Sequence, residues 1–110
     1  MKIEHTPLTM QLLQNTAAST IPAGSSVWLY GSRARGDARA DSDWDLLILL
    51  DKDEITTEDF DRYGYPFIEL GWLYNADITP QLYTRREWQS RQFTPFFNNI
   101  EADKKIIYGS

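Results

Sequence analysis

One continuous apolar run constrains the fold of this chain more than any other feature. Residues 46–50 read Leu-Leu-Ile-Leu-Leu, and Asp43, Asp45 and Asp51 stand on either side of them. An apolar run of this length between acids is typical of a strand that is buried on both faces of a sheet. We therefore expect residues 43–50 to form the central strand of a sheet that is flanked by helices.

The other elements follow from apolar spacing, caps and turn residues. Further strands are expected at 26–30, 76–83 and 104–108, and helices at 7–19, from residue 32, at 58–74, at 85–91 and at 95–102. The expected helix caps are Thr6, Thr57 and Thr84. Pro66 should kink or split its helix, and Pro80 favours an edge position for its strand. The alternating order predicts an α/β or α+β fold.

Length and composition exclude several classes of protein. A chain of 110 residues is expected to be one domain, 1–110. It has no cysteine, which excludes disulfides, thiol catalysis and cysteine zinc sites. The net charge of −5 disfavours binding to duplex nucleic acid through its phosphates. No apolar run approaches the roughly 18 residues of a membrane span, and no signal-peptide core follows the first residues, so we expect a cytoplasmic protein.

Two short motifs separated by ten residues carry the candidate chemistry. The first is Gly31-Ser32, directly after an expected strand, and the second is Asp43-Trp44-Asp45. Side chains alternate along a strand, so Asp43 and Asp45 should share one face and repel each other unless a cation lies between them. Mg²⁺ suits such a pair because it prefers hard oxygen ligands together with substrate phosphates.

The Gly31-Ser32 turn is expected to bind phosphate. It opens a helix whose first N–H groups lack partners, and glycine lets a phosphate approach the backbone closely. Arg33, Arg35 and Arg39 follow it and could neutralise phosphate charge, although a solvated surface explains each of them equally well. We favour Arg35. Asp77, an acid between apolar residues in an expected strand, is the candidate third carboxylate, although an exposed acid at a strand end is the alternative.

Together these motifs resemble the nucleotidyltransferases of the DNA polymerase beta superfamily. The segment from Tyr30-Gly31-Ser32 to Asp43-Trp44-Asp45 is similar to the minimal nucleotidyltransferase (MNT) branch in particular. The strong match covers residues 27–50 and extends more loosely to about residue 88. The resemblance implies a polymerase beta-like fold with a mixed sheet, and transfer of a nucleoside monophosphate from an NTP, with ATP expected, to an acceptor hydroxyl.

The resemblance also implies roles for individual residues. Asp43, Asp45 and Asp77 match the metal-binding and catalytic carboxylates, which hold Mg²⁺ or Mn²⁺. Gly31 and Ser32 match the phosphate turn, and Arg35 lies in the same motif. Nothing in the chain supplies the second domain with which many relatives bind their acceptor. Short members of the family often act beside a helical partner of the HEPN type, frequently as antitoxins.

Two functions therefore stay open from the sequence. One is an enzyme that nucleotidylates an acceptor, including an acceptor on a partner protein. The other is an antitoxin or regulatory module that masks a HEPN-like partner, with or without catalysis. The many aromatic residues at 60–74 and 93–97 fit either a core or a surface for such a partner or for a second copy of the chain.

Overall fold

A four-stranded mixed sheet forms the middle of the protein, which a computed structural model describes over residues 7–110. The strands are β1 (Ser26–Tyr30), β2 (Trp44–Leu50), β3 (Ile78–Thr84) and β4 (Lys105–Tyr108). Their order in the sheet is β3-β2-β1-β4. β1 runs antiparallel to β2 and β4, whereas β2 runs parallel to β3. The predicted mixed sheet flanked by helices is confirmed.

The apolar run is an interior strand, as expected. Residues Leu46 to Leu50 are each no more than 2% exposed, because β1 and β3 lie on either side of β2 and helices cover both faces. β3 is an edge strand, which agrees with the position of Pro80. It begins at Ile78 rather than at residue 76, so Asp77 lies just before the strand and not within it.

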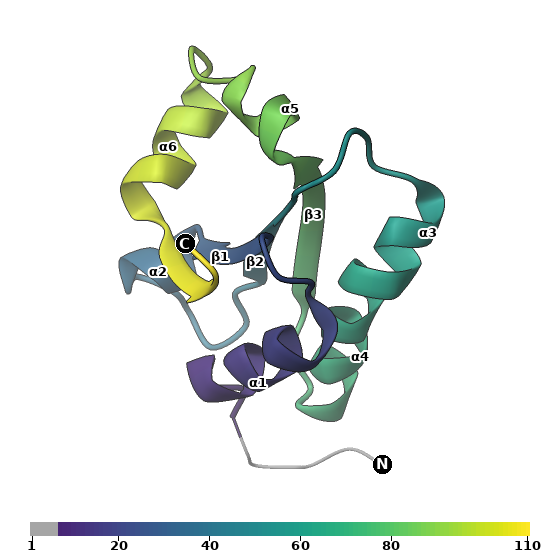
Figure 1. The fold of residues 1–110 in the computed structure, drawn as a ribbon. Helices are drawn as coiled ribbons and strands as arrows, with labels where there is room; N and C mark the ends of the chain where they lie inside the picture. Colours follow the sequence, from purple (N-terminus) through teal and green to yellow (C-terminus); the bar gives the residue numbers. More distant parts are fainter. Residues whose placement is uncertain (1–6) are drawn as a thin grey trace.

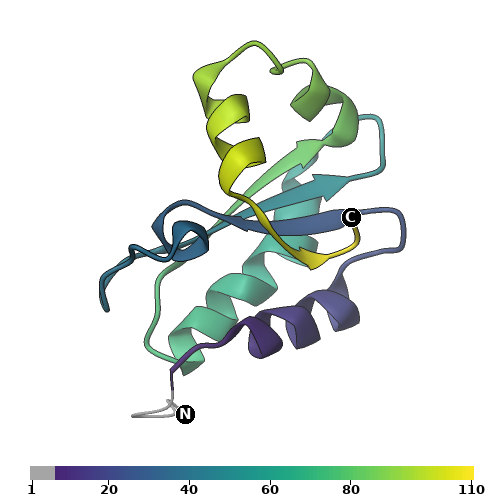
Figure 2. The same ribbon diagram turned by 90° about the vertical axis from the view of Figure 1, so that its left-hand side faces the viewer.

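Helices cover the sheet on its two faces (Figures 1 and 2). On one face lie α1 (Met10–Thr20) and α4 (Tyr65–Leu73), whose buried Leu13 and Phe67 join Leu46 and Ile48 in one core cluster. On the other face lie α5 (Arg85–Gln89) and α6 (Pro95–Asp103), which build a smaller core around Trp88. The short α2 (Ser32–Arg35) follows β1 directly.

The helix starts correct two predictions. Thr9, not Thr6, caps α1 through a hydrogen bond from the Leu12 N–H, and Thr6 lies outside the described residues. Thr56, not Thr57, caps α3 (Thr57–Asp59). The predicted cap at Thr84 is confirmed.

The predicted helix at 58–74 is divided into three pieces. A π-helical segment, η1 (Phe60–Gly64), follows α3, and α4 then starts with Pro66 in its first turn. Pro66 has no N–H to donate to the preceding turn, so it interrupts regular α-helical bonding where η1 meets α4. Phe67 is fully buried, whereas Trp72 is 57% exposed and is therefore not a core residue. No helix among the described residues is long and apolar enough to cross a membrane.

The cap of α3 makes stability depend on pH. Burial opposes ionisation of Asp59, but hydrogen bonds from Lys52 and Thr56 outweigh it and lower the pKa of this carboxyl below its usual 3.8. The folded state therefore holds the proton less tightly than the unfolded chain. The stabilisation is complete above the unfolded pKa and is lost as the pH falls through the lower folded pKa.

We therefore expect the free energy of unfolding to fall as the pH drops below about 4, and Asp59→Asn to flatten that decline. Urea unfolding between pH 3 and pH 7 measures this free energy for both proteins. Lys52→Met should flatten the decline in part, because it removes the cation at 2.8 Å from Asp59 Oδ2. An identical pH dependence in Asp59→Asn and the wild type would contradict this assignment.

Candidate active site

The expected phosphate turn lies where β1 ends and α2 begins. Gly31 has φ 76° and ψ −158°, a conformation that residues with a Cβ rarely adopt. A Cβ on Gly31 would come within 3.0 Å of Asp45 Oδ2. Glycine is therefore favoured at residue 31 for two reasons. Its backbone angles suit glycine, and a side chain there would collide with the carboxylate of Asp45. The two motifs singled out in the sequence meet at this point.

Asp45 lies inside the sheet, on its α5–α6 face. It is opposite Tyr30 in β1 and Thr79 in β3, and it is half-buried. Thr79 Oγ1 donates a hydrogen bond to Asp45 Oδ1 at 2.8 Å. Of the predicted carboxylates, Asp45 is thus the one held firmly next to the turn.

Asp43 and Asp77 lie at the same end of β2 and β3, each one residue before its strand. Trp44 and Ile78 are register partners, and the Trp44 N–H donates to the Asp77 carbonyl at 2.8 Å. The two acids therefore lie on neighbouring segments, directly before the paired strands β2 and β3. Both side chains are exposed. Within residues 7–110, however, no three acidic or histidine side chains gather closely enough to hold a metal ion. The assignment of all three as metal ligands stays a prediction.

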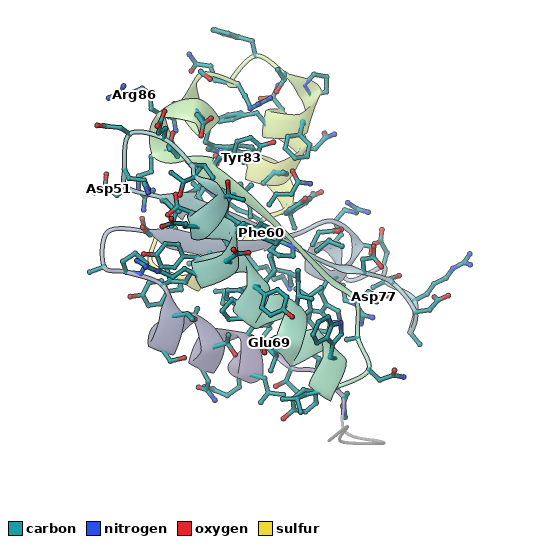
Figure 3. The ribbon with its side chains drawn as sticks, turned by 90° about the vertical axis from the view of Figure 1, so that its right-hand side faces the viewer. Asp51, Phe60, Glu69, Asp77, Tyr83 and Arg86 are labelled. Carbon is teal, nitrogen blue, oxygen red and sulfur yellow. The ribbon has the colours of Figure 1, made fainter. Side chains whose placement is uncertain are left out.

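Asp51 lies far from this group. It follows the last residue of β2, whereas Asp45 is the second residue of that strand. Figure 3 shows Asp51 and Asp77 at opposite ends of the sheet. Asp51 is therefore not a substitute for Asp77 as a third carboxylate.

Arg33 and Arg35, which follow the turn, make different contacts. Arg33 donates to the carbonyls of Ala40 and Ser42 at 2.9–3.2 Å and stacks on Trp44, with its guanidinium 4.5 Å from the ring centroid. It thereby fixes the loop that leads into Asp43. Arg35 forms ion pairs with Asp37 and Asp103, and these hydrogen bonds raise the pKa of its guanidinium. A nucleotide-binding role for Arg35 stays a prediction and requires it to exchange those partners.

A row of polar side chains continues from Asp45 along the same face. Gln81 Nε2 donates to the Tyr30 hydroxyl at 3.3 Å. Burial, followed by the charge of Asp45 and then by Tyr83, raises the pKa of Tyr30 to about 12. The Tyr30 phenol is therefore neutral at physiological pH and is no candidate for a general base.

The sequence family agrees with this geometry. Residues 13–79 match the family described as "Polymerase beta, Nucleotidyltransferase", which is more than half of the chain. The chain belongs to this nucleotidyltransferase family. No curated protein matches it.

Three solved structures with the same fold are described as toxin–antitoxin proteins. A toxin–antitoxin crystallised with AMP-PNP is 18% identical, with a TM-score of 0.63, and the match covers 94% of this chain and 75% of that one. A mutant MntA–HpeT toxin–antitoxin is 15% identical, with a TM-score of 0.61 and the same coverage. A tri-AMPylated Shewanella oneidensis HEPN toxin in complex with MNT antitoxin is 17% identical, with a TM-score of 0.51. That match covers 93% of this chain and 74% of the other. At these identities the likeness shows the fold.

The side chains of this member of the nucleotidyltransferase family suit a hard divalent cation. The donors at the turn are carboxylate oxygens, which Mg²⁺ and Mn²⁺ prefer. The absence of a Cβ on Gly31 leaves Asp45 Oδ2 directly beside the turn, where a phosphate and a carboxylate would need a shared cation. Asp45 therefore fits the expected ion. Asp43 and Asp77 each stand one residue before the strands β2 and β3.

A hollow of about 600 Å³ opens at this end of the sheet. Its lining includes Asp77, Ser42 and Arg33, together with the aromatic side chains Trp44, Trp72 and Tyr74. Trp44 lies on the face of β2 opposite Asp45, so the hollow opens on the α4 side of the sheet. Asp77 lines it, whereas Gly31, Ser32, Asp43 and Asp45 do not.

Sequence reasoning missed two residues of this site and the observed role of a third. Thr79 and Gln81 depend on the parallel pairing of β2 with β3, which no local pattern reveals. The role of Arg33 as a loop anchor depends on carbonyls seven and nine residues further along the chain. The alternation of polar Thr79, Gln81 and Tyr83 on β3 was the one available signal that this face is polar.

Proposed function

We propose that this protein is an Mg²⁺-dependent nucleotidyltransferase that transfers a nucleoside monophosphate, AMP from ATP, to a hydroxyl on a helical HEPN-type partner protein. The observation that carries the proposal is the close approach of Gly31 to Asp45, which brings a phosphate-binding turn to a carboxylate. The AMP-PNP in one neighbour and the AMPylated HEPN toxin in another support the choice of nucleotide and acceptor.

The reaction is an in-line displacement at the α-phosphorus. The acceptor oxygen forms the new P–O bond, the bond to pyrophosphate breaks, and the hydroxyl proton passes to a base. The backbone of Gly31-Ser32 would hold the phosphates, and Asp43 and Asp45 would hold the ion. Mg²⁺, when bound, neutralises phosphate charge in the transition state. Asp77, exposed beside the hollow, would orient the acceptor hydroxyl and accept its proton.

A masking role without catalysis is the second candidate, and one surface favours it. Trp72 is 57% exposed and packs edge-on against Tyr65, which is 39% exposed. Large exposed aromatic side chains on one helix are typical of a protein interface. Such a surface serves either function, because a transferase must also dock its acceptor protein.

The test is transfer of label from α-³²P-labelled ATP, GTP, CTP or UTP in the presence of Mg²⁺. The protein is incubated alone and with the product of a neighbouring gene. We expect label from ATP on the partner, none with EDTA, and none with the Asp43→Asn, Asp45→Asn double variant. Mg²⁺ and ATP should also raise the melting temperature of the wild type and not that of the double variant.

Two outcomes distinguish the candidates. Absence of label on any partner, with every NTP, contradicts the transferase. If the double variant neutralises the partner as well as the wild type does, masking is sufficient for the biological effect.

A further inference from the structure

The two oxygens of the Asp45 carboxylate have different surroundings. Oδ1 accepts a hydrogen bond from Thr79 Oγ1 at 2.8 Å. Oδ2 lies beside Gly31, at the place that a Cβ on that residue would occupy. One oxygen is thus tied to the neighbouring strand, and the other is turned toward the phosphate turn.

The fold places Thr79 where this bond is favourable. Asp45 and Thr79 are register partners in the parallel pair β2–β3, so their side chains stand on the same face of the sheet. Threonine is restricted about its first side-chain torsion, so its hydroxyl is held with little loss of freedom. A hydroxyl that donates to a carboxylate makes a charge-assisted bond, stronger than one between neutral groups.

We infer that Thr79 is a positioning residue for Asp45. Its hydroxyl occupies Oδ1 and fixes the rotation of the carboxylate, which leaves Oδ2 as the oxygen that meets the cation at the turn. Among the described residues no side chain hydrogen-bonds to Asp43 in this way, so the orientation of the pair depends on Asp45. The inference rests on the proposed function, because that function requires the cation.

Two substitutions of Thr79 separate the hydroxyl from the size of the side chain. Thr79→Val keeps the branched shape and removes the donor, whereas Thr79→Ser keeps the donor. Mn²⁺ affinity of the full chain is read from the electron paramagnetic resonance signal of free Mn²⁺. We expect Thr79→Val to weaken Mn²⁺ binding about tenfold, as loss of a hydrogen bond to a metal ligand does elsewhere. Thr79→Ser should stay close to the wild type.

The same measurement includes its controls. Thr79 is exposed, so the valine variant should fold, and circular dichroism checks this. In an Asp45→Asn background Thr79→Val should cause no further loss, because its effect passes through Asp45. Equal Mn²⁺ affinity in Thr79→Val and the wild type overturns the positioning role. Equal weakening by valine and serine overturns it too, since the hydroxyl is then not the cause.

Failure of the proposed function gives a different result. If the wild-type protein itself binds no Mn²⁺ at millimolar concentration, with or without ATP, then the cation site is wrong and the inference falls with it. If the wild type binds Mn²⁺ and only the Thr79 series shows no difference, the proposed function stands and the inference alone is rejected.

Discussion

Replacing Gly31 by alanine should weaken nucleotide binding at least tenfold and slow transfer further. The new Cβ would come within 3.0 Å of Asp45 Oδ2, so either the turn or the carboxylate must move. A displacement of about 1 Å at a reacting site can cost a factor of about 100 in rate. We expect at least a tenfold loss of ATP affinity, about 1.4 kcal/mol. Isothermal titration with a non-hydrolysable ATP analogue measures the binding, and label transfer measures the rate.

Gly36→Ala is the control for the contact with Asp45, because Gly36 is the positive-φ glycine at the other end of α2. Gly36 has φ 84°, similar to the 76° of Gly31, but a Cβ there would meet no atom within 4 Å. The backbone costs differ, because Gly36 is in the left-handed region, where another residue costs about 1 kcal/mol, whereas the ψ of −158° puts Gly31 in a region that is essentially restricted to glycine. Only Gly31→Ala disturbs Asp45. If Gly36→Ala loses nucleotide affinity to the same extent, then strain in α2 is the cause, and the close contact with Asp45 is not.

The sequence was sufficient for the sheet because local patterns determine its strands. The apolar run before Asp51 identified β2, and its interior position followed from burial on both faces. The helix caps were less predictable. Thr56 and Thr57 are neighbours with the same side chain, and the capping box that Thr56 forms with Asp59, three residues further on, makes Thr56 the cap of α3. The π-helical turn at 60–64 likewise has no local signal.

The candidate site likewise has one part that the sequence predicted and another that it did not. The spacing of Gly31-Ser32 from Asp43 and Asp45 predicted that turn and acids lie together, and the contact of Gly31 with Asp45 agrees with it. The contribution of Thr79 was invisible because it depends on the register of two strands that are 34 residues apart. For Arg33 the sequence left phosphate contact and a solvated surface equally open, and its guanidinium instead donates to backbone carbonyls of the adjoining loop.

Asp77 separates a transferase from a masking module. Asp77 lines the hollow, and it precedes β3 as Asp43 precedes the neighbouring strand β2. The expected phosphate turn, in contrast, is formed by Gly31-Ser32. Asp77→Asn should therefore leave ATP affinity within a few-fold of the wild type. Transfer should fall by a factor of about 100 to 10,000, the usual contribution of a general base. The interaction that is lost is one used mainly in the transition state.

Asp51→Asn is the control, because it makes the same change of charge at the opposite end of β2. Its rate of transfer should equal that of the wild type. Titration with the ATP analogue and label transfer, measured on all three proteins, decide the matter. If Asp77→Asn transfers nucleotide at the wild-type rate, the proton must leave the acceptor by another route and Asp77 is only an exposed acid before β3. If Asp77→Asn transfers none yet neutralises the partner fully, then binding alone silences the partner and the transferase activity serves another purpose.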